Sequence, residues 1–351
     1  MRPALKAGLL PVWRDRDTLQ IGIDPRRAIA LTGIGRAAAV VSLLDGSRDR
    51  AGVIRAARDY GVPAESADRV LALLAAAGAL HDFPAKLLRE LPGTLRARLA
   101  PELATASLAY GDGDGGARTL ARRRMAFVRV YGAGRIGSCV ASLLAASGVG
   151  RLACEDPGTA RPCDLTPAGL GVDDLDTPRE RGAARAIRRV APDVRTDNSG
   201  GRPDLAVLTG DALTGEAGAE AASSLVRDRV PHLAVQASEA VGVVGPLVVP
   251  GRSACLRCMD LTRAERDPAW PLILAQASGA RCEPQACDTV LAAMTGALAA
   301  AQALAFIDRA GAVPAVTNGT LELVLPGWAW RRRTWLPHPG CTCNAASRPR
   351  A

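Results

Sequence analysis

Four cysteines form two close pairs that together can hold a metal ion. Cys255 and Cys258 make a Cys-x-x-Cys pair, and Cys341 and Cys343 make a Cys-x-Cys pair near the other end of the chain. Four thiolates supply the tetrahedral ligand set of a structural zinc site, and folding can bring distant pairs together. The sequence therefore predicts a structural Zn²⁺ that ties the C-terminal segment to its domain. Two alternatives stay open: His338 in place of one sulfur, and two pairs without metal.

Two further cysteines, Cys282 and Cys287, flank the short run Glu-Pro-Gln-Ala. A thiolate at the start of a helix can act as a nucleophile. The neighbouring Asp288 would raise the pKa of such a thiol, and no histidine lies nearby in the sequence. We therefore expect a buried or incidental role for this pair.

A glycine-rich turn lies between a predicted strand and a predicted helix. The apolar run 126–131 leads into Gly132-Ala-Gly134-Arg-Ile-Gly137, and a helical pattern follows over 138–147. In this context the glycines let the backbone approach phosphate groups, and the helix N-terminus offers free N–H groups to them. A second strand, 150–154, is followed by Asp156, whose carboxylate can accept hydrogen bonds from ribose hydroxyls. These features together predict a nucleotide-binding fold.

A third predicted strand, 205–209, ends in Gly210-Asp211. Ligands of open α/β sheets bind at the carboxyl ends of the strands, where an aspartate can hold Mg²⁺. An aspartate in this place can equally cap a helix. Both roles remain open for Asp211.

The first 82 residues predict a small α+β domain. Three apolar runs separated by polar turns predict an antiparallel sheet, and three helical patterns follow, an order typical of a winged-helix-like domain. The last helix carries one arginine against two acidic residues, so we do not expect it to read DNA. An extended peptide added to the sheet edge, or a purely structural or dimerising role, remains. The predicted strands are 8–13, 19–23 and 28–31, and the predicted helices are 35–44, 50–59 and 64–77.

Composition indicates an ordinary globular protein rather than a nucleic-acid or membrane-surface binder. The chain has 351 residues, 48% of them hydrophobic, which is enough for two domains with cores. Its formal charge of +9 rests on arginines that alternate with acidic residues. The uncharged run 289–307 predicts a buried core helix, although it is long enough to span a bilayer. Nine cysteines without a recognisable secretion signal favour a cytoplasmic location.

These patterns divide the chain into four parts. The segment between the two predicted domains contains several prolines and a glycine-rich run, which predict a linker. The parts are a winged-helix-like domain at 1–82, a linker at 83–125, a nucleotide-fold domain at 126–343 and a tail at 344–351.

Residues 126–343 resemble the ThiF/MoeB superfamily, the bacterial relatives of ubiquitin-activating enzymes. The resemblance rests on the glycine turn, Gly148-Val-Gly150, Thr209-Gly-Asp211, Gly242-Val-Val-Gly-Pro246 and the two cysteine pairs, all in the same order. It implies a doubly wound, Rossmann-like sheet and the transfer of AMP from ATP to the C-terminal carboxylate of a small protein or peptide. The nucleotide-binding residues it implies are Gly132, Gly134, Gly137, Asp156, Arg181 and Asp211.

The cations of that superfamily are altered in this chain. Where the superfamily carries Asn-Leu-Asn-Arg-Gln, this chain has Asp164-Leu-Thr-Pro-Ala168, without the arginine. The superfamily's phosphate-holding lysine is matched best by Arg181 or Arg179, since the domain contains no lysine. An arginine fork does not replace a compact ammonium at a site shaped for one, and nucleotidyl transfer depends on such charges. The comparison therefore implies a degenerate site for ATP and Mg²⁺.

The whole layout resembles the leader-peptide-binding, ThiF-like component of azol(in)e cyclodehydratases. The segment Cys258–Trp270 and the terminal segment Trp335–Cys343 carry this resemblance. It implies that the protein binds the leader of a ribosomal precursor peptide and presents it to a YcaO-type partner, and the superfamily suggests a homodimer. The alternatives are an active adenylyltransferase and a structural or nucleotide-sensing dimer. The implied peptide-binding residues are Ala28, Ile29, Ala30 and Leu31 on a strand, and Asp68, Val70, Leu71 and Leu74 on a helix.

Overall fold

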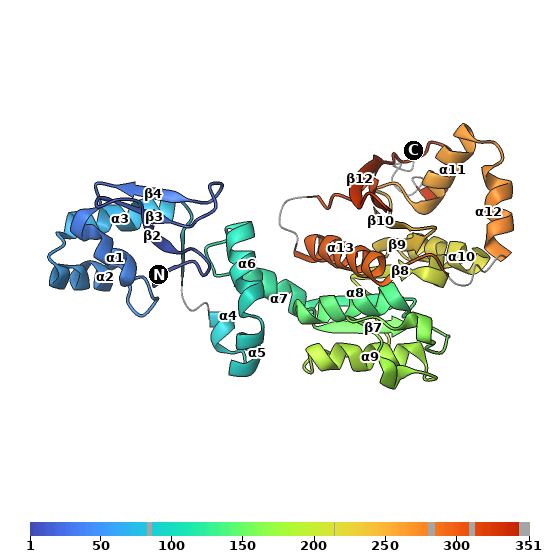
Figure 1. The fold of residues 1–351 in the computed structure, drawn as a ribbon, viewed down its shortest axis with the longest axis horizontal. Helices are drawn as coiled ribbons and strands as arrows, with labels where there is room; N and C mark the ends of the chain where they lie inside the picture. Colours follow the sequence, from blue (N-terminus) through green and yellow to red (C-terminus); the bar gives the residue numbers. More distant parts are fainter. Residues whose placement is uncertain (83–85, 214, 280–284, 309–312, 344–351) are drawn as a thin grey trace, which may run out of the picture. The chain divides into compact units, whose positions relative to one another are not determined.

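The computed structural model describes residues 1–82, 86–213, 215–279, 285–308 and 313–343 (Figure 1). The chain folds into two compact units, Met1–Ala121 and Arg122–Ala351.

The first unit begins with the small α+β lobe that the sequence predicts. Its three-stranded antiparallel sheet has the order β2-β3-β4. The first and last strands of the lobe, β1 and β5, form a separate antiparallel pair. The β1–β5 pair was not predicted because each strand has only three residues and its partner lies far away in the sequence. The strands are β1 Pro3–Leu5, β2 Pro11–Trp13, β3 Thr18–Ile21, β4 Ile29–Thr32 and β5 Leu80–Asp82, and the helices are η1 Gly35–Ala38, α1 Ala39–Ser42, α2 Arg50–Ala57, η2 Arg58–Tyr60 and α3 Ala64–Ala76.

Helix α3 packs its apolar stripe into the core of this lobe. Ala67, Val70, Leu71 and Leu74 recur at the three- and four-residue spacing that places side chains on one helix face, and all four are buried. They meet Leu19, Ile21 and Leu31 from the sheet in one hydrophobic cluster. The sheet is therefore held in place by α3 from one side.

The segment 83–125, predicted as a linker, contains four helices in its described residues. Two of its prolines mark helix starts, since Pro92 is the N-cap of α5 and Pro101 lies in the first turn of α6, where proline is favoured. Leu95, Leu99 and Leu103 recur every four residues and bury a small core of their own. These two prolines, which suggested a linker in the sequence, thus mark the starts of helices. The helices are α4 Lys86–Arg89, α5 Gly93–Arg98, α6 Ala100–Tyr110 and α7 Ala117–Met125.

The second unit is built on a seven-stranded mixed sheet with the order β12-β11-β10-β9-β8-β6-β7. Strands β6 to β9 pair in parallel, and β10 to β12 continue the sheet in antiparallel pairs. The α/β class predicted from the sequence is confirmed. The strands are β6 Phe127–Tyr131, β7 Arg151–Glu155, β8 Leu205–Thr209, β9 His232–Ser238, β10 Val241–Val248, β11 Gly319–Val324 and β12 Ala329–Thr334.

Helices cover both faces of this sheet, as the central strand β8 shows. Every residue of β8 is buried. Leu205 and Val207 point into the core that includes α8 and α13, whereas Ala206 and Leu208 point into the core that includes α10. A strand covered on both faces has a continuous apolar sequence. The helices are α8 Arg135–Ala146, α9 Arg179–Val190, α10 Gly215–Arg227, α11 Leu256–Arg266, α12 Trp270–Gly279 and α13 Thr289–Asp308.

Helix α13 is the one helix among the described residues that is long and apolar enough to cross a membrane. In the fold it lies beside α8 and against β9 and β10 (Figure 1). Leu291, Ala299 and Ala303 are fully buried in the main core. This packing agrees with the buried core helix expected at 289–307.

Candidate functional site

The glycine turn joins the end of β6 to the start of α8 in very tight packing. Gly132 has a φ of +87°, and a Cβ there would lie 2.4 Å from the carbonyl oxygen of Thr209. A Cβ at Gly137 would lie 1.8 Å from the carbonyl oxygen of Gly132. These two glycines are therefore required by the fold itself, because β6, β8 and α8 meet here with no room for a side chain.

The third glycine of the turn stands in a more open place. Gly134 is the N-cap of α8, and the nearest atom to a Cβ there would be Oδ1 of Asp164 at 3.6 Å. The turn lies where the strand order reverses, with β7 on one side of β6 and β8 on the other. A helix N-terminus at such a reversal is the usual phosphate-binding position of open α/β sheets.

Asp156 lies beside the turn, where the sequence predicts it. Its Oδ2 accepts a hydrogen bond from the backbone N–H of Ala133 at 2.7 Å, and its Oδ1 accepts one from Gly158 at 2.7 Å. The side chain is only 7% exposed. A carboxylate retains lone pairs beyond two such bonds, so this one can still accept a ribose hydroxyl. That role stays a prediction.

The cation next to the turn is Arg179, not Arg181. The Arg179 Nε donates to Oδ2 of Asp164 at 2.9 Å, and one of its terminal nitrogens lies 3.7 Å from Oδ1 of Asp156. Its side chain is 12% exposed. Of the two arginines that the sequence left open, Arg179 is the one beside the turn, and which of them binds phosphate stays a prediction.

Arg181 lies on a different face of α9. It is exposed and lines a cavity of about 380 Å³ together with Cys154, Arg185 and Arg188. Successive residues of a helix are about 100° apart, so residues 179 and 181 cannot face the same ligand. The sequence could not choose between the two arginines because the start of the helix was unknown.

Replacing these arginines one at a time tests which of them contributes to nucleotide binding. We expect Arg179→Ala to weaken binding of an ATP analogue about tenfold, because it removes a charge-assisted contact. Arg181→Ala serves as the matched control and should change the affinity less than about twofold. Calorimetric titration measures both. An Arg181→Ala variant that loses affinity while Arg179→Ala keeps it would contradict the assignment.

Thr209 ends strand β8, next to the glycine turn, and Asp211 follows shortly after it. Asp211 lies in η5 (Gly210–Leu213) directly after β8, but its side chain is outside the described part of the chain. Its predicted magnesium role stays a prediction. The Thr209 hydroxyl donates toward the carbonyl oxygens of Tyr131 at 3.1 Å and Gly132 at 2.9 Å, which fixes the turn against β8.

Arg135 also lies at the glycine turn, and the sequence analysis gave it no role of its own. Its guanidinium donates to the carbonyl oxygen of Cys287 at 2.6 Å and to the hydroxyl of Thr289 at 3.2 Å. It thus joins the start of α8 to the start of α13. Its place in the glycine motif gave no signal of this contact, since the partners lie about 150 residues away in the sequence.

Cys287 lies in this joint and is buried. Burial raises the pKa of its thiol, with the carboxylate of Asp288 acting in the same direction and the guanidinium of Arg135 acting against it. A thiol held protonated in this way is a poor nucleophile. This agrees with the buried role expected from the sequence, whereas Cys282 lies outside the described residues.

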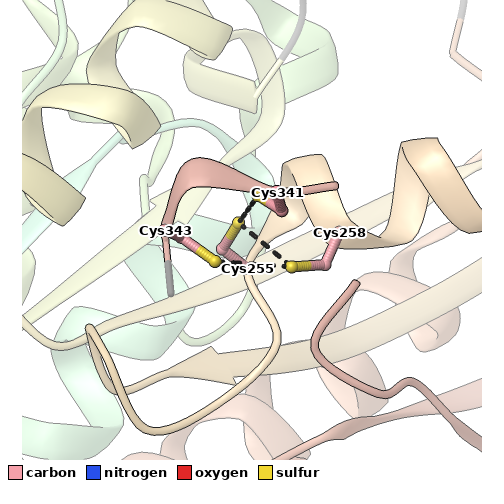
Figure 2. A group of neighbouring side chains, drawn as sticks. All are labelled: Cys255, Cys258, Cys341 and Cys343. Atoms are coloured by element: carbon pink, nitrogen blue, oxygen red, sulfur yellow. Dashed lines mark hydrogen bonds between the residues drawn. The ribbon is translucent and has the colours of Figure 1, made fainter. Parts of the chain in front are cut away.

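The four predicted ligand cysteines lie together (Figure 2). Cys255 and Cys258 come from the start of α11, and the segment after β12 brings the other two. The sulfur atoms are 3.7 Å apart for Cys255–Cys258 and Cys255–Cys341, and 3.4 Å apart for Cys258–Cys343. Four sulfurs at about 2.3 Å from one zinc ion lie about 3.8 Å from each other. The donor set and its spacing therefore fit a tetrahedral metal ion.

Apolar side chains surround the cluster. Val248, Met259 and Trp335 pack around the sulfurs. Burial raises the pKa of Cys255 to about 12, so without a cation this thiol stays protonated at neutral pH. A metal ion reverses this preference by binding the thiolate.

His338 is turned to other partners. Its Nε2 lies 2.8 Å from a carboxylate oxygen of Glu265, and its Nδ1 accepts the backbone N–H of Gly340. Of the two ligand sets that the sequence left open, the geometry favours four sulfurs.

Strand β4 forms an open edge of the first unit. Within the described residues it pairs with β3 alone. Backbone bonds from Arg14 to Thr18 and from Gly22 to Leu10 show that the even-numbered residues of β3 bond to β2. Because bonding alternates along an antiparallel strand, Ile29 and Leu31 must bond to β3, and the backbone groups of Ala30 point to the open edge.

Three of the four helix residues predicted to contact a peptide are buried in the core of the lobe. Val70, Leu71 and Leu74 are 6%, 1% and 0% exposed. Asp68 is partly exposed and pairs with Arg50 at 2.7 Å. The apolar spacing that suggested a binding face is the spacing of a core face. Val70, Leu71 and Leu74 support the sheet from behind. Of the predicted strand residues, Ala30 is exposed at the open edge, whereas Leu31 is buried.

The comparisons with known proteins agree with this architecture. A model of the ThiF family matches residues 112–202. A comparison with curated protein sequences found no match. Among solved structures, E. coli MccB bound to AMPCPP and MccA is 16% identical with a TM-score of 0.73, over 98% of this chain and 99% of that one.

Two further structures show the same likeness. The microcin C7 biosynthetic enzyme MccB in complex with N-formylated MccA is 16% identical with a TM-score of 0.70, over 98% of this chain and 100% of that one. The structure of PaaA is 16% identical with a TM-score of 0.70, over 94% and 99% of the two chains.

Residues 112–202 match the ThiF family, and the fold of the chain is similar to those of MccB and PaaA. The resemblance to the ThiF/MoeB superfamily inferred from the sequence is confirmed. The likeness extends over the small front lobe as well as the sheet domain, since almost the whole of each chain is covered.

Proposed function

We propose that this protein binds a ribosomal precursor peptide and activates its C-terminal carboxylate with ATP. The observation that carries the proposal is the full-length likeness to MccB, which has been crystallised with AMPCPP and with N-formylated MccA. An N-formyl group is characteristic of a newly translated bacterial polypeptide. This proposal puts an active adenylyltransferase first, whereas the sequence analysis favoured a protein that presents a peptide to a partner.

The chemistry follows from the charges at the glycine turn. A peptide carboxylate oxygen attacks the α-phosphorus of ATP, the bond between the α-phosphorus and the bridging oxygen breaks, and pyrophosphate leaves with its electron pair. The start of α8 stabilises the negative charge on the phosphates, with Arg179 beside it. The residues that we assign to the nucleotide are Gly132, Gly134, Gly137, Asp156, Arg179 and Asp211, the last as the Mg²⁺ ligand.

We assign peptide recognition to the edge of β4 in a winged-helix-like lobe. The other edge of the same sheet is protected, because Pro11 of β2 has no N–H to offer. On β4, Ala30 is exposed and its backbone groups point outward. An extended peptide can add there as a further strand, held by backbone hydrogen bonds.

We assign a structural Zn²⁺ to Cys255, Cys258, Cys341 and Cys343. The buried sulfurs and their spacing support this choice, because four thiolates leave no open position for catalysis. The ion would hold the end of the chain against α11. Reduced cysteines of this kind suit a cytoplasmic protein.

A variant of Ala30 tests the peptide edge. Ala30→Pro removes one outward N–H without touching the bonds between β3 and β4, so the lobe should stay folded. We expect its affinity for the peptide to fall about tenfold or more. Ala30→Ser keeps the N–H and is the matched control. The measurement is fluorescence anisotropy with labelled synthetic peptides, taken from any short open reading frame found beside the gene.

Exchange between ATP and labelled pyrophosphate tests the reaction. Peptide-dependent exchange that Arg179→Ala reduces would support activation of a carboxylate. Tight peptide binding without any exchange would contradict it and favour the second candidate, presentation of a leader peptide to a YcaO-type partner.

One observation favours that second candidate. Arg179 is already held by two carboxylates, and the segment Asp164–Ala168 contains no arginine, so Arg179 has little free charge to offer a triphosphate. If no peptide binds and exchange is absent, a structural or nucleotide-sensing homodimer would be the remaining interpretation.

A further inference from the structure

The arginine that we assign to the phosphate site lies between two carboxylates. Arg179 lies between Asp164, whose Oδ2 is 2.9 Å from its Nε, and Asp156, whose Oδ1 is 3.7 Å from a terminal nitrogen. All three side chains are close to 90% buried. Burial strengthens these charge interactions, because water screens them less. Two carboxylates therefore share the guanidinium of Arg179.

Asp164 is also placed close to where a phosphate must lie. It sits in the short helix η3 (Pro162–Asp164), and its Oδ2 accepts the backbone N–H of Arg161 at 2.9 Å. Its other oxygen, Oδ1, is the nearest atom to the space beside Gly134, at 3.6 Å from the position of a Cβ there. A phosphate approaching the N-terminus of α8 thus meets this carboxylate.

We propose that Asp164 is a specificity-determining residue that makes the site discriminate against highly charged phosphate groups. Its carboxylate competes with phosphate for Arg179 and repels each negative charge brought to Gly134. A triphosphate with several charges is disfavoured more than a monophosphate. The site then holds an adenylate, with one phosphate charge, relatively better than it holds ATP. This inference rests on the proposed nucleotide function of the turn.

The preference has a physical use in carboxylate activation. An interaction accelerates a step only when it favours the transition state over the bound reactants. A carboxylate that opposes the intact triphosphate more than the separating adenylate and pyrophosphate lowers the barrier between them, and so assists the departure of pyrophosphate. Asp164 acts here as a positioning and charge-setting residue, since no bond to it forms or breaks.

The test compares two nucleotides and two variants. Asp164→Asn keeps the shape of the side chain and an oxygen for the Arg161 N–H but removes the charge. Calorimetric titration without Mg²⁺ should show AMPCPP binding about tenfold tighter to this variant than to the unmodified protein, and AMP binding less than about threefold tighter. The change in the ratio of the two affinities is a readout that a purely structural role would not move.

Asp174 offers a closely matched control. It caps the short helix η4 (Val172–Asp174) through the N–H of Gly171 at 2.8 Å and pairs with Nε of Arg185 at 2.6 Å, the same two interactions that Asp164 makes elsewhere. Asp174→Asn should leave both nucleotide affinities within about twofold. Thermal melting of all three proteins shows that the comparison concerns folded molecules.

Several outcomes would overturn the inference. Weaker AMPCPP binding by Asp164→Asn would mean that the carboxylate only orients Arg179, and weakening confined to solutions with Mg²⁺ would mean that it is a metal ligand. The inference would also be excluded if Asp164→Asn raised the affinities for AMP and AMPCPP equally, or if this variant did not bind AMPCPP. The proposed function can fail on its own. In that case peptide-dependent pyrophosphate exchange is absent, while Asp164→Asn still changes the ratio of the AMPCPP and AMP affinities.

Discussion

Substitution of Gly137 by alanine should abolish nucleotide binding and destabilise the sheet domain. The added Cβ would lie 1.8 Å from the carbonyl oxygen of Gly132 and 2.8 Å from the hydroxyl of Thr209. The first of these is a backbone atom, which cannot rotate away as a side chain can. Forcing an extra methyl group into such a place costs about 3 kcal/mol or more, because strands and helix must shift apart. We expect a fall of roughly 10 °C in melting temperature.

Gly134→Ala separates folding from binding at the same turn. A Cβ there meets only Oδ1 of Asp164 at an ordinary contact distance, and the backbone is extended rather than left-handed. We expect stability within about 1 kcal/mol of the unmodified protein. The methyl group nevertheless fills the space in which a phosphate must approach the helix, so the affinity for AMPCPP should fall about tenfold or more. Unaltered AMPCPP binding by both alanine variants would show that nucleotide does not bind at this turn.

Replacement of Cys255 and Cys341 together by serine should remove a bound metal ion and with it the attachment of the chain end. The two residues come from segments 86 residues apart and contribute half of the four sulfurs. Binding of zinc to four thiolates contributes on the order of 10 kcal/mol in small zinc domains. A loss of several kcal/mol in unfolding free energy is therefore expected here, where Met259 of α11 and Trp335, directly after β12, also lie in one apolar cluster.

The measurement combines elemental analysis with thermal melting. The unmodified protein should contain one zinc ion per chain, and a strong chelator should lower its melting temperature. Cys163→Ser, at an exposed cysteine outside the cluster, should change neither quantity. A purified protein without stoichiometric metal, whose stability is the same after the double substitution, would rule out the assigned metal site.

Much of the second unit could be predicted from the order of its short motifs. An apolar run, a glycine turn, a helix, a second strand and an aspartate each depend on neighbours within a few residues, and such local patterns survive without tertiary information. The same applies to the cysteine pairs, because thiolate spacing reflects the needs of one ion. The structure brings the four sulfurs together as this reasoning expects.

Other features depended on which side of an element faces the core. The stripe of Val70, Leu71 and Leu74 is equally suited to a binding face and to a packing face, and only the sheet lying against it decides for packing. The prolines at 92 and 101 are equally suited to a linker and to helix starts. The spacing of apolar residues shows that a helix has an apolar face, but it does not show whether the protein's own core or a partner covers that face.

Residue types and their spacing were enough to predict a glycine turn after a strand, an acid after the second strand and a cluster of four sulfurs. The folded chain was needed to show that Arg179 rather than Arg181 faces the turn, that Asp164 lies beside it, and that β4 is the open edge of its sheet. The reason is that local chemistry depends on neighbours in the sequence, whereas the direction of a side chain and the pairing of a strand are set by segments far away in the chain.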